Sequence, residues 1–266
     1  MHESVDPLAM IRRNLALIAG GRLLSADQRV ATGHGSLDAA LHGGLARGRV
    51  HELFAETSDD SASTAGFAAM LALRTVGRQA PTFWLRSDQA ERHIGGVHAS
   101  GLVELGGDPD GLVLGIAPDS KMLLRSAADA ARCVGLKALI VECWGKCPEL
   151  DLTASRRLAL AAEQSGVTIF LLRLDAEPVP SAADTRWSVG AAPSQALEAN
   201  APGLPAFDIE LLRRRAGPSG MRWRLEWDRD RLSFRELALS GAVVSLPAGR
   251  PPAPNDRRDP GLRLSA

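Results

Sequence analysis

A polar loop that follows a predicted strand is the first candidate for chemistry in this chain. Residues 55–64 (AETSDDSAST) come directly after the strand-like segment 49–54 (RVHELF) and precede an Ala- and Leu-rich stretch. When a strand enters a helix through such a loop, the backbone N–H groups at the helix N-terminus can bind phosphate. A phosphate-binding loop also needs glycines, a lysine, and a Ser or Thr for Mg²⁺. The position and length of residues 55–64 therefore raise the hypothesis of a nucleotide site.

The composition of this loop argues against nucleotide binding. Residues 55–64 contain neither glycine nor lysine, and Asp59 and Asp60 add two carboxylates that we expect to lie where phosphates would rest. Each carboxylate would repel a phosphate charge ~4 Å away by about 4 kcal/mol at an effective dielectric near 20. Micromolar binding totals only about −8 kcal/mol. We expect no bound triphosphate, unless a metal ion held by Asp59, Asp60 and Glu142 offsets the repulsion.

Apolar segments that alternate with helical patterns must position this loop. Helix-like stretches separate the short apolar runs, which predicts βαβ units and an α/β fold with a mostly parallel sheet flanked by helices. In such sheets, ligands bind at the carboxyl ends of the strands. The expected strands are 49–54, 82–86, 111–117, 136–144 and 167–174, and the expected helices are 35–44, 64–78, 89–100, 120–134 and 152–165.

The pattern changes after residue 178. Residues 207–215 and 221–228 alternate with period two around the turn Gly-Pro-Ser-Gly, which predicts an antiparallel hairpin, and residues 231–236 could add a third strand. Residues 185–191 could form a further short strand. The predicted organisation is an N-terminal helix and linker (1–28), an α/β core (29–178), a β-rich part that completes the core (179–246) and a disordered Pro- and Arg-rich tail (247–266).

The predicted hairpin carries the densest group of basic residues, interleaved with tryptophan. Such a ribbon could follow single-stranded DNA by phosphate contact and stacking, or offer anchors to a protein partner. It could equally be a solvated outer face whose tryptophans belong to the core, a reading that the nearby acidic residues favour. The contact candidates are Arg213, Arg214, Arg215, Arg222, Trp223, Arg224 and Trp227.

Other kinds of site find little support in the sequence. Cys143 and Cys147 have no second Cys pair or nearby His to complete a zinc site, and we interpret them as ordinary thiols near a strand end. The six His form no metalloprotease motif, and no Gly-x-Ser-x-Gly signature of hydrolases occurs. We expect no catalytic residue, no metal and no cofactor.

Composition sets the broad class of the protein. Lys+Arg and Asp+Glu are both 31, so no net charge attracts nucleic acid or an acidic membrane to the whole surface. Three Cys are too few for a disulfide framework, no signal peptide is apparent and no apolar run reaches membrane-spanning length. The expectation is a cytoplasmic protein without a membrane partner.

Several motifs together resemble RecA-type recombinases over residues 29–174. These motifs are Ser36-Leu-Asp38, the segment 43–54 (GGLARGRVHELF), and 138–142 (ALIVE), whose Glu142 lies where that family's Walker B strand ends in an acid. Asp88 lies near the position of the family's catalytic Glu. The resemblance implies a RecA-like fold with a degenerate phosphate loop: Ala55 and Asp60 stand at glycine positions, Ser61 stands at the lysine position, and Ala62 follows it.

Two C-terminal stretches, 185–194 (TRWSVGAAPS) and 211–228 (LLRRRAGPSGMRWRLEWD), extend the resemblance to the ImuA family. That resemblance implies a non-catalytic accessory protein of SOS-induced, error-prone translesion DNA synthesis. Its implied partners are an ImuB-type inactive Y-family polymerase relative and, indirectly, a DnaE-type polymerase, with RecA and single-stranded DNA as further candidates. It also implies association with the nucleoid during DNA damage.

Two alternative functions stay open at this stage. The first is a divergent RecA-like ATPase that uses Asp88 and Glu142 with a metal ion. The second is a division inhibitor similar to SulA.

Overall fold

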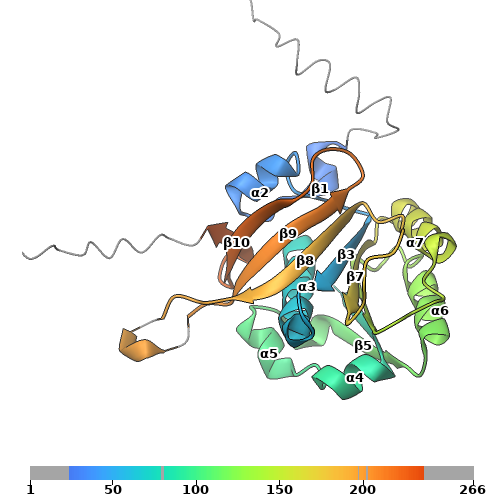
Figure 1. The fold of residues 1–266 in the computed structure, drawn as a ribbon, viewed down its shortest axis with the longest axis horizontal. Coiled ribbons are helices and arrows are strands. Elements are labelled where there is room, and N and C mark those ends of the chain that lie inside the picture. The colour runs from blue at the N-terminus through green and yellow to red at the C-terminus, as the bar shows by residue number, and fades with distance from the viewer. Residues whose placement is uncertain (1–23, 79–80, 197, 202, 237–266) are drawn as a thin grey trace, which may run out of the picture.

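A single nine-stranded sheet organises the protein (Figure 1). The computed structural model describes residues 24–78, 81–196, 198–201 and 203–236. The helix expected near the N-terminus and the tail 247–266 lie outside these residues. The strand order is β11-β10-β9-β8-β3-β7-β6-β4-β5. The α/β prediction, with a mostly parallel sheet and an antiparallel C-terminal extension, is confirmed.

Six neighbouring strands of this sheet are parallel. They are β8 (Thr185–Ala192), β3 (Val50–Ala55), β7 (Thr168–Leu174), β6 (Ala138–Trp144), β4 (Thr82–Ser87) and β5 (Leu112–Ala117). In β6, Ile140 belongs to one apolar cluster, whereas Leu139 and Val141 belong to the other. The central strands are therefore continuously apolar because both of their faces are covered.

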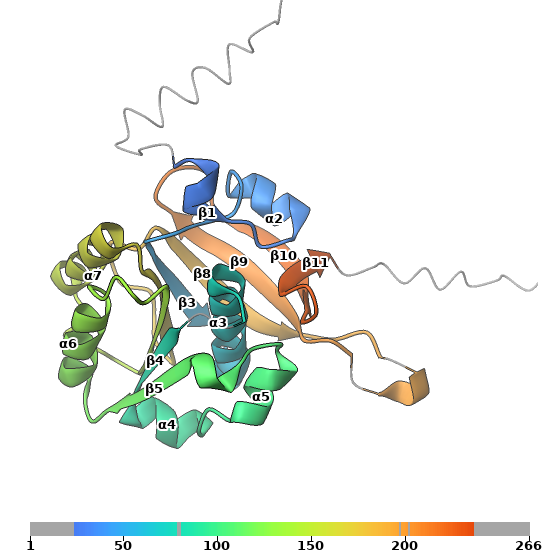
Figure 2. The same cartoon turned by 180° about the vertical axis from the view of Figure 1, so that it is seen from behind.

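Helices cover the two faces of the sheet separately (Figures 1 and 2). The Ala-rich helix α3 (Ser61–Val76) packs with one apolar cluster, and α6 (Ser120–Ala130) and α7 (Leu152–Ser165) pack with the other. The single helix expected over 89–100 is wrong. Gly95, at φ 79°, ends α4 (Asp88–Ile94), and α5 (Ala99–Glu104) begins after a short connection.

The C-terminal strands extend the sheet in antiparallel fashion. β9 (Ala206–Arg214) pairs with β8 and with β10 (Met221–Asp228), and β11 (Ser233–Glu236) pairs with β10. The predicted hairpin and its third strand are therefore confirmed. At a register shift between β8 and β9, Arg186 pairs with Arg213 and Trp187 with Leu211, so β9 has one extra residue at this point.

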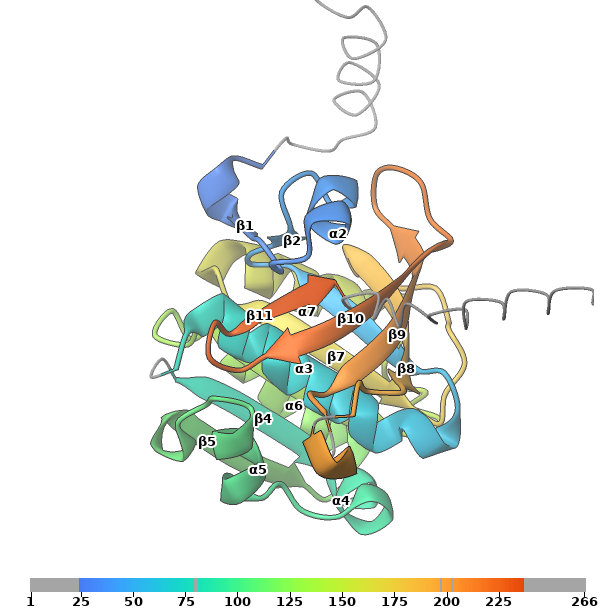
Figure 3. The same cartoon turned by 90° about the vertical axis from the view of Figure 1, so that its left-hand side faces the viewer.

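A small ribbon lies beside one end of the hairpin (Figure 3). It consists of β1 (Arg29–Val30) and β2 (Leu45–Ala46), with α2 (Gly35–Ala40) between them. Gly44 has φ +113°, and a Cβ there would lie 2.0 Å from the Val30 carbonyl oxygen, so only glycine fits. Short 3-10 turns occur at Ala26–Gln28, Ser58–Asp60, Pro109–Gly111 and Glu198–Asn200. None of the helices in the described ranges is long and apolar enough to cross a bilayer.

Candidate functional site

The loop after β3 is closed by one of its own side chains. The Asp60 carboxylate accepts hydrogen bonds from Thr57, with Oδ2 2.7 Å from Thr57 Oγ1 and 3.1 Å from Thr57 N. Its other oxygen, Oδ1, lies 2.8 Å from the backbone N of Ala191 on β8. The expectation that both carboxylates face a phosphate position is wrong for Asp60, which turns back onto the loop; Asp59 is exposed. A carboxylate of the protein thus satisfies amides that an anion could bind.

Two hydroxyl side chains in the first turn of α3 also form internal hydrogen bonds. Ser61, at the position where a phosphate-binding lysine would be expected, is buried and donates to the Ser58 carbonyl oxygen at 2.7 Å. Thr64 donates to the Asp60 carbonyl oxygen at 2.9 Å. Ala62 is exposed and has no polar side-chain atom, and Ala55 ends β3. The side chains of Ser61, Ala62 and Thr64 therefore supply no cation, and the hydroxyls of Ser61 and Thr64 are already used within the protein.

The electrostatics of Asp60 follow from these contacts. Partial burial opposes its ionisation, but the hydrogen bonds from Ala191 and Thr57 outweigh that effect and lower the pKa of Asp60 below its usual value. The carboxylate is therefore ionised at neutral pH. Its negative charge lies beside the N-terminus of α3, where the helix dipole stabilises it.

The acid at the end of β6 is locked in a buried ion pair. Glu142 is fully buried, and its Oε1 and Oε2 lie 2.9 Å from Nη2 and Nε of Arg86 respectively. Trp84 Nε1 donates to the same Oε2 at 2.8 Å. Arg86 also donates to Glu91 and to the Gly95 carbonyl oxygen. A metal ion could reach the Glu142 carboxylate only by displacing a bidentate guanidinium and an indole N–H.

Asp88 lies apart from this ion pair. It is the first residue of α4 and forms an ion pair with Arg92 one turn later, at the surface. Within residues 24–236 as described, no group of three or more His, Cys, Asp or Glu residues is placed to hold a metal ion. The structure therefore does not bring Asp59, Asp60 and Glu142 together as ligands.

A large cavity lies at the carboxyl ends of β3, β7 and β6. It has a volume of about 990 Å³ and extends between the loop after β3, the loop after β6 and the segment after β7. Both cationic and anionic side chains line it, together with one thiol. The polar lining residues used below are Lys146, Cys147 and Arg173.

Arg173 is the unusual member of this cavity wall. It is 3% exposed, and its Nε and Nη1 have no hydrogen-bond partner among the described residues. Its guanidinium lies 5.8 Å from the Phe54 ring centroid, and Arg186 lies 5.7 Å from the same centroid. Arg186, in contrast, forms a buried ion pair with Glu52 at 2.8 Å. A buried cation without a carboxylate partner is costly, so Arg173 marks a place where charge is not balanced.

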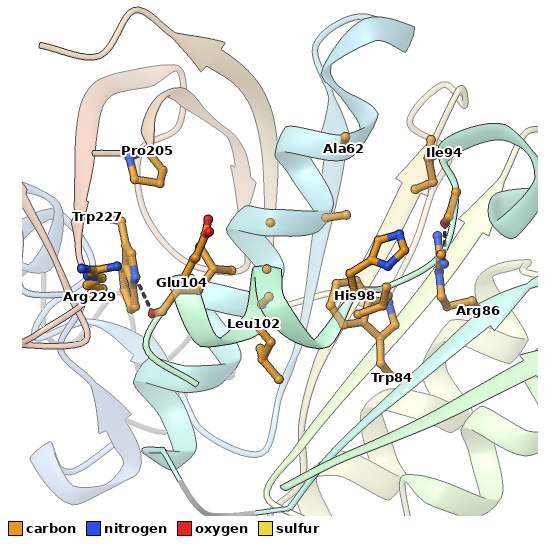
Figure 4. A pocket seen from close by; sticks show the side chains of 18 of the residues that line it. Ala62, Trp84, Arg86, Ile94, His98, Leu102, Glu104, Pro205, Trp227 and Arg229 are labelled. Carbon is orange, nitrogen blue, oxygen red and sulfur yellow. Dashed lines mark hydrogen bonds between the residues drawn. The ribbon is translucent and has the colours of Figure 1, made fainter. Parts of the chain in front are cut away.

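A second cavity, of about 680 Å³, lies between α3, the connection of α4 to α5, and the chain before β9 (Figure 4). Small residues of α3, including Ala62 and Gly66, form part of its wall. Trp227 Nε1 donates to the Leu105 carbonyl oxygen at 2.9 Å at one end, and Arg86 donates to the Gly95 carbonyl oxygen at the other. The labelled polar groups of Trp227 and Arg86 are thus already used within the protein.

The hairpin separates its tryptophans from its arginines. Trp227 is completely buried, and Trp223 is half-buried with its ring centroid 6.2 Å from that of Trp187. The predicted contact role of Trp227 is therefore wrong, because its side chain belongs to the core. Arg222 and Arg224 are exposed, but each is paired on β9: Arg222 Nη2 lies 2.6 Å from Glu210, and Arg224 Nη2 lies 2.6 Å from Asp208.

The arginines near the end of β9 have different environments. Arg213 is exposed and donates a long hydrogen bond, 3.3 Å, to the Ala183 carbonyl oxygen. Arg214 faces the ribbon at the end of the sheet, where it donates to the Ala40 carbonyl oxygen and lies 3.2 Å from His42 Nε2. Arg215 is exposed. The hairpin surface is therefore a set of ion pairs with Arg213 and Arg215 at one end, rather than a uniformly basic ribbon.

The sequence analysis did not identify the arginines that lie beside the candidate site residues in the structure. Arg86 lies opposite Glu142 where β4 and β6 pair in parallel. Residue spacing does not reveal which strands are neighbours in the sheet, so this contact could not be predicted from the sequence. Arg173 did leave a signal, because an arginine within the apolar run TIFLLRL is unusual for a buried strand.

Comparison with known proteins adds evidence on the fold. No protein-family model matches the sequence, and no curated protein sequence matches it. Solved structures do match, among them the crystal structure of the RadB recombinase, with a TM-score of 0.53 at 14% sequence identity. The match covers 79% of this chain and all of that one. At this identity the likeness concerns the fold alone. Together with the sheet order and the loop between β3 and α3, it shows that the chain has a RecA-like fold.

Proposed function

We propose that this chain is a non-catalytic, RecA-like accessory protein of the ImuA kind, which acts as a scaffold in damage-inducible, error-prone translesion DNA synthesis. The observation that carries the non-catalytic part is the internal pairing of two acidic residues at the carboxyl edge of the sheet. Asp60 accepts hydrogen bonds from the backbone N–H groups of Thr57 and Ala191, and Arg86 holds Glu142. A sheet that keeps the RecA-like arrangement while its phosphate site is filled by internal contacts is better suited to binding than to ATP turnover.

The partner proposal rests on the sequence of the β8–β10 region. Residues 185–194 and 211–228 carry the resemblance to ImuA proteins. In the structure these residues form neighbouring strands β8, β9 and β10 at one side of the sheet. We propose that the exposed end of this region, with Arg213 and Arg215, contacts an ImuB-type inactive polymerase relative. Through that partner the chain would reach a DnaE-type polymerase.

Direct DNA binding by the hairpin receives less support than protein binding. Arg222 and Arg224 would have to leave Glu210 and Asp208 to contact phosphates. Trp227 is buried, so it offers no stacking surface to a base. RecA and single-stranded DNA therefore stay secondary candidates beside the polymerase relative.

Co-purification with an ImuB-type protein tests this proposal. We expect the unmodified chain to retain the partner and the double variant Arg213→Ala/Arg215→Ala to bind it at least about tenfold more weakly, since Arg anchors commonly contribute more than 1 kcal/mol. The matched control is Arg156→Ala/Arg157→Ala, which removes two exposed arginines from α7.

Each outcome of the co-purification has a clear meaning. Equal binding by all three proteins would place the interface away from the end of β9. Failure of the unmodified chain to bind any ImuB-type protein would overturn the accessory role. Cell filamentation on expression, in the absence of a polymerase partner, would favour the division-inhibitor alternative instead.

A further inference from the structure

Cys147 lines the 990 Å³ cavity together with the unbalanced Arg173, and Cys143 lies four residues before it in the chain. Cys143 lies in β6 and is buried, and Cys147 follows it in the loop after the strand. Cys147 is 7% exposed and lines the cavity, so a small molecule that enters the cavity can reach its sulfur. Gly145, at φ 66°, makes the turn between them. Both side chains belong to the same buried apolar cluster.

The sheet register places Arg173 beside this pair. Cys143 and Arg173 are direct partners on the parallel strands β6 and β7, so their side chains leave the same face of the sheet. Arg173 also lines the cavity, as Cys147 does. Because its Nε and Nη1 have no hydrogen-bond partner in the described part of the chain, its charge is free to stabilise a nearby anion.

We propose that Cys147 is a reactive thiolate site for small hydroperoxides, with Cys143 as the resolving thiol and Arg173 as the positioning cation. This assignment is independent of the translesion role, because it depends only on the cavity, the dithiol and the unpaired guanidinium.

The chemistry balances with a hydroperoxide as the only oxidant. The Cys147 thiolate attacks the peroxide oxygen, the O–O bond breaks, and the products are a sulfenic acid on Cys147 and an alkoxide or hydroxide that takes up a proton. Cys143 sulfur then attacks the Cys147 sulfur. An S–S bond forms, the S–O bond breaks, and the thiol proton and the hydroxyl group leave as water. A dithiol reductant restores both thiols by exchange.

The charge environment supports the thiolate form of Cys147. The neighbouring Cys143 thiol lowers the pKa of Cys147 to about 7, with further lowering by the Leu150 backbone N–H and the Arg173 charge, against the effects of burial and of the Glu149 charge. The proximity of Cys147, together with burial, raises the pKa of Cys143, so that this thiol keeps its proton. The other charged groups that face the pair or line the cavity are Glu142, Glu149, Lys146, Asp151, Asp175, Glu56 and Glu177.

Alkylation kinetics test the reactivity of Cys147. The protein carries Cys133→Ser, because Cys133 is exposed and would react as well. We expect the rate of modification of Cys147 by iodoacetamide to reach half of its maximum near pH 7, whereas free cysteine does so near about 8.5. Arg173→Met should slow the reaction at neutral pH by about threefold or more, and Arg173→Lys should restore most of it.

Peroxide treatment tests the resolving role. With the Cys133→Ser protein, we expect mass spectrometry to show the loss of two hydrogens, reversed by dithiothreitol. With Cys143→Ser added, dimedone should label Cys147 as the trapped sulfenic acid; with Cys147→Ser added instead, no label should appear.

The proposal is overturned if Cys147 alkylates no faster than free cysteine at pH 7, or if peroxide that oxidises free cysteine leaves the pair reduced. Both of these measurements need only the Cys133→Ser protein, so they test the proposal even where a further variant fails to fold.

Discussion

The two halves of the carboxyl edge of the sheet differ in whether their charged side chains have partners. In the half formed by the loop after β3 and the end of β6, Glu142 is paired with Arg86 and Asp60 is hydrogen-bonded by Thr57 and Ala191. In the half formed by the cavity, Arg173 is equally buried but lacks a carboxylate partner among the described residues. The first half has replaced a possible ligand with its own side chains, and the second half keeps charge available for chemistry.

The largest expected effect comes from breaking the buried pair in the first half. Glu142→Gln would leave the Arg86 guanidinium buried against a neutral amide, so we expect the free energy of unfolding to fall by about 3–5 kcal/mol. Urea denaturation measures this change. The control is Asp129→Asn, which removes an exposed pair with Arg132 and should change the free energy of unfolding by less than about 0.5 kcal/mol. A loss below about 1 kcal/mol for Glu142→Gln would contradict a strongly stabilising buried ion pair between Glu142 and Arg86.

Asp60→Ala should cost less, because Asp60 is only partly buried. Loss of its hydrogen bonds to Thr57 and Ala191 should lower the free energy of unfolding by about 1 kcal/mol at neutral pH. The pKa of Asp60 is lowered in the folded protein, so its contribution is present above the unfolded pKa of about 3.9 and is lost as pH falls through the folded value. Urea denaturation at about pH 7 and about pH 3 should therefore show a smaller difference between the variant and the parent at the lower pH.

Asp59→Ala is the matched control for Asp60→Ala. Asp59 is the exposed neighbour of Asp60, and we expect its loss to change the free energy of unfolding by less than about 0.5 kcal/mol. Equal effects of the two substitutions would mean that Asp60 does not close the loop.

Arg173→Met tests the half of the carboxyl edge that contains the cavity. Removing a buried cation that has no carboxylate partner leaves no opposite charge unpaired, and methionine fills a similar volume. We therefore expect the free energy of unfolding to stay the same or to rise, with no loss above about 1 kcal/mol. A loss as large as that of Glu142→Gln would show that Arg173 has a hidden partner and would remove the contrast between the two halves.

The smallest effect is expected at the hairpin surface, which provides the baseline for exposed pairs. Arg222→Ala should lower the free energy of unfolding by about 0.5 kcal/mol through loss of the exposed pair with Glu210. Denaturation in low salt and in about 1 M salt should show that the effect shrinks with screening. A salt-independent loss above about 2 kcal/mol would mean that this pair behaves like the buried one.

Local patterns predicted the elements of this protein better than their contacts. Sequence patterns identified five of the six parallel strands, β3, β4, β5, β6 and β7. A strand covered on both faces must be apolar throughout, as in β6, but the edge strand β5 is apolar although half of its residues are exposed. Helix α3 begins at Ser61, three residues before the predicted start, because the 3-10 turn of Ser58–Asp60 leads directly into the helix. The break between α4 and α5 could have been inferred from Gly95 and Gly96.

The site was harder to predict, because its key contacts join distant segments. The loss of glycine and lysine from the loop was visible in the sequence, but the return of Asp60 onto Ala191 depends on β8 lying beside β3. Trp227 and Trp223 lie on the same strand face, but only Trp227 is fully buried, where it donates to the Leu105 carbonyl oxygen and packs against Phe234. Such differences arise from long-range packing and not from residue spacing.

Isothermal titration of ATP into the full-length protein, with and without Mg²⁺, tests the central claim most directly. The closed loop and the locked Glu142 predict no measurable binding up to about 1 mM nucleotide and no hydrolysis above background. Micromolar affinity that requires Mg²⁺, or sustained ATP hydrolysis that is lost in Asp88→Ala, would show that this edge of the sheet still works as a nucleotide site and would contradict the account.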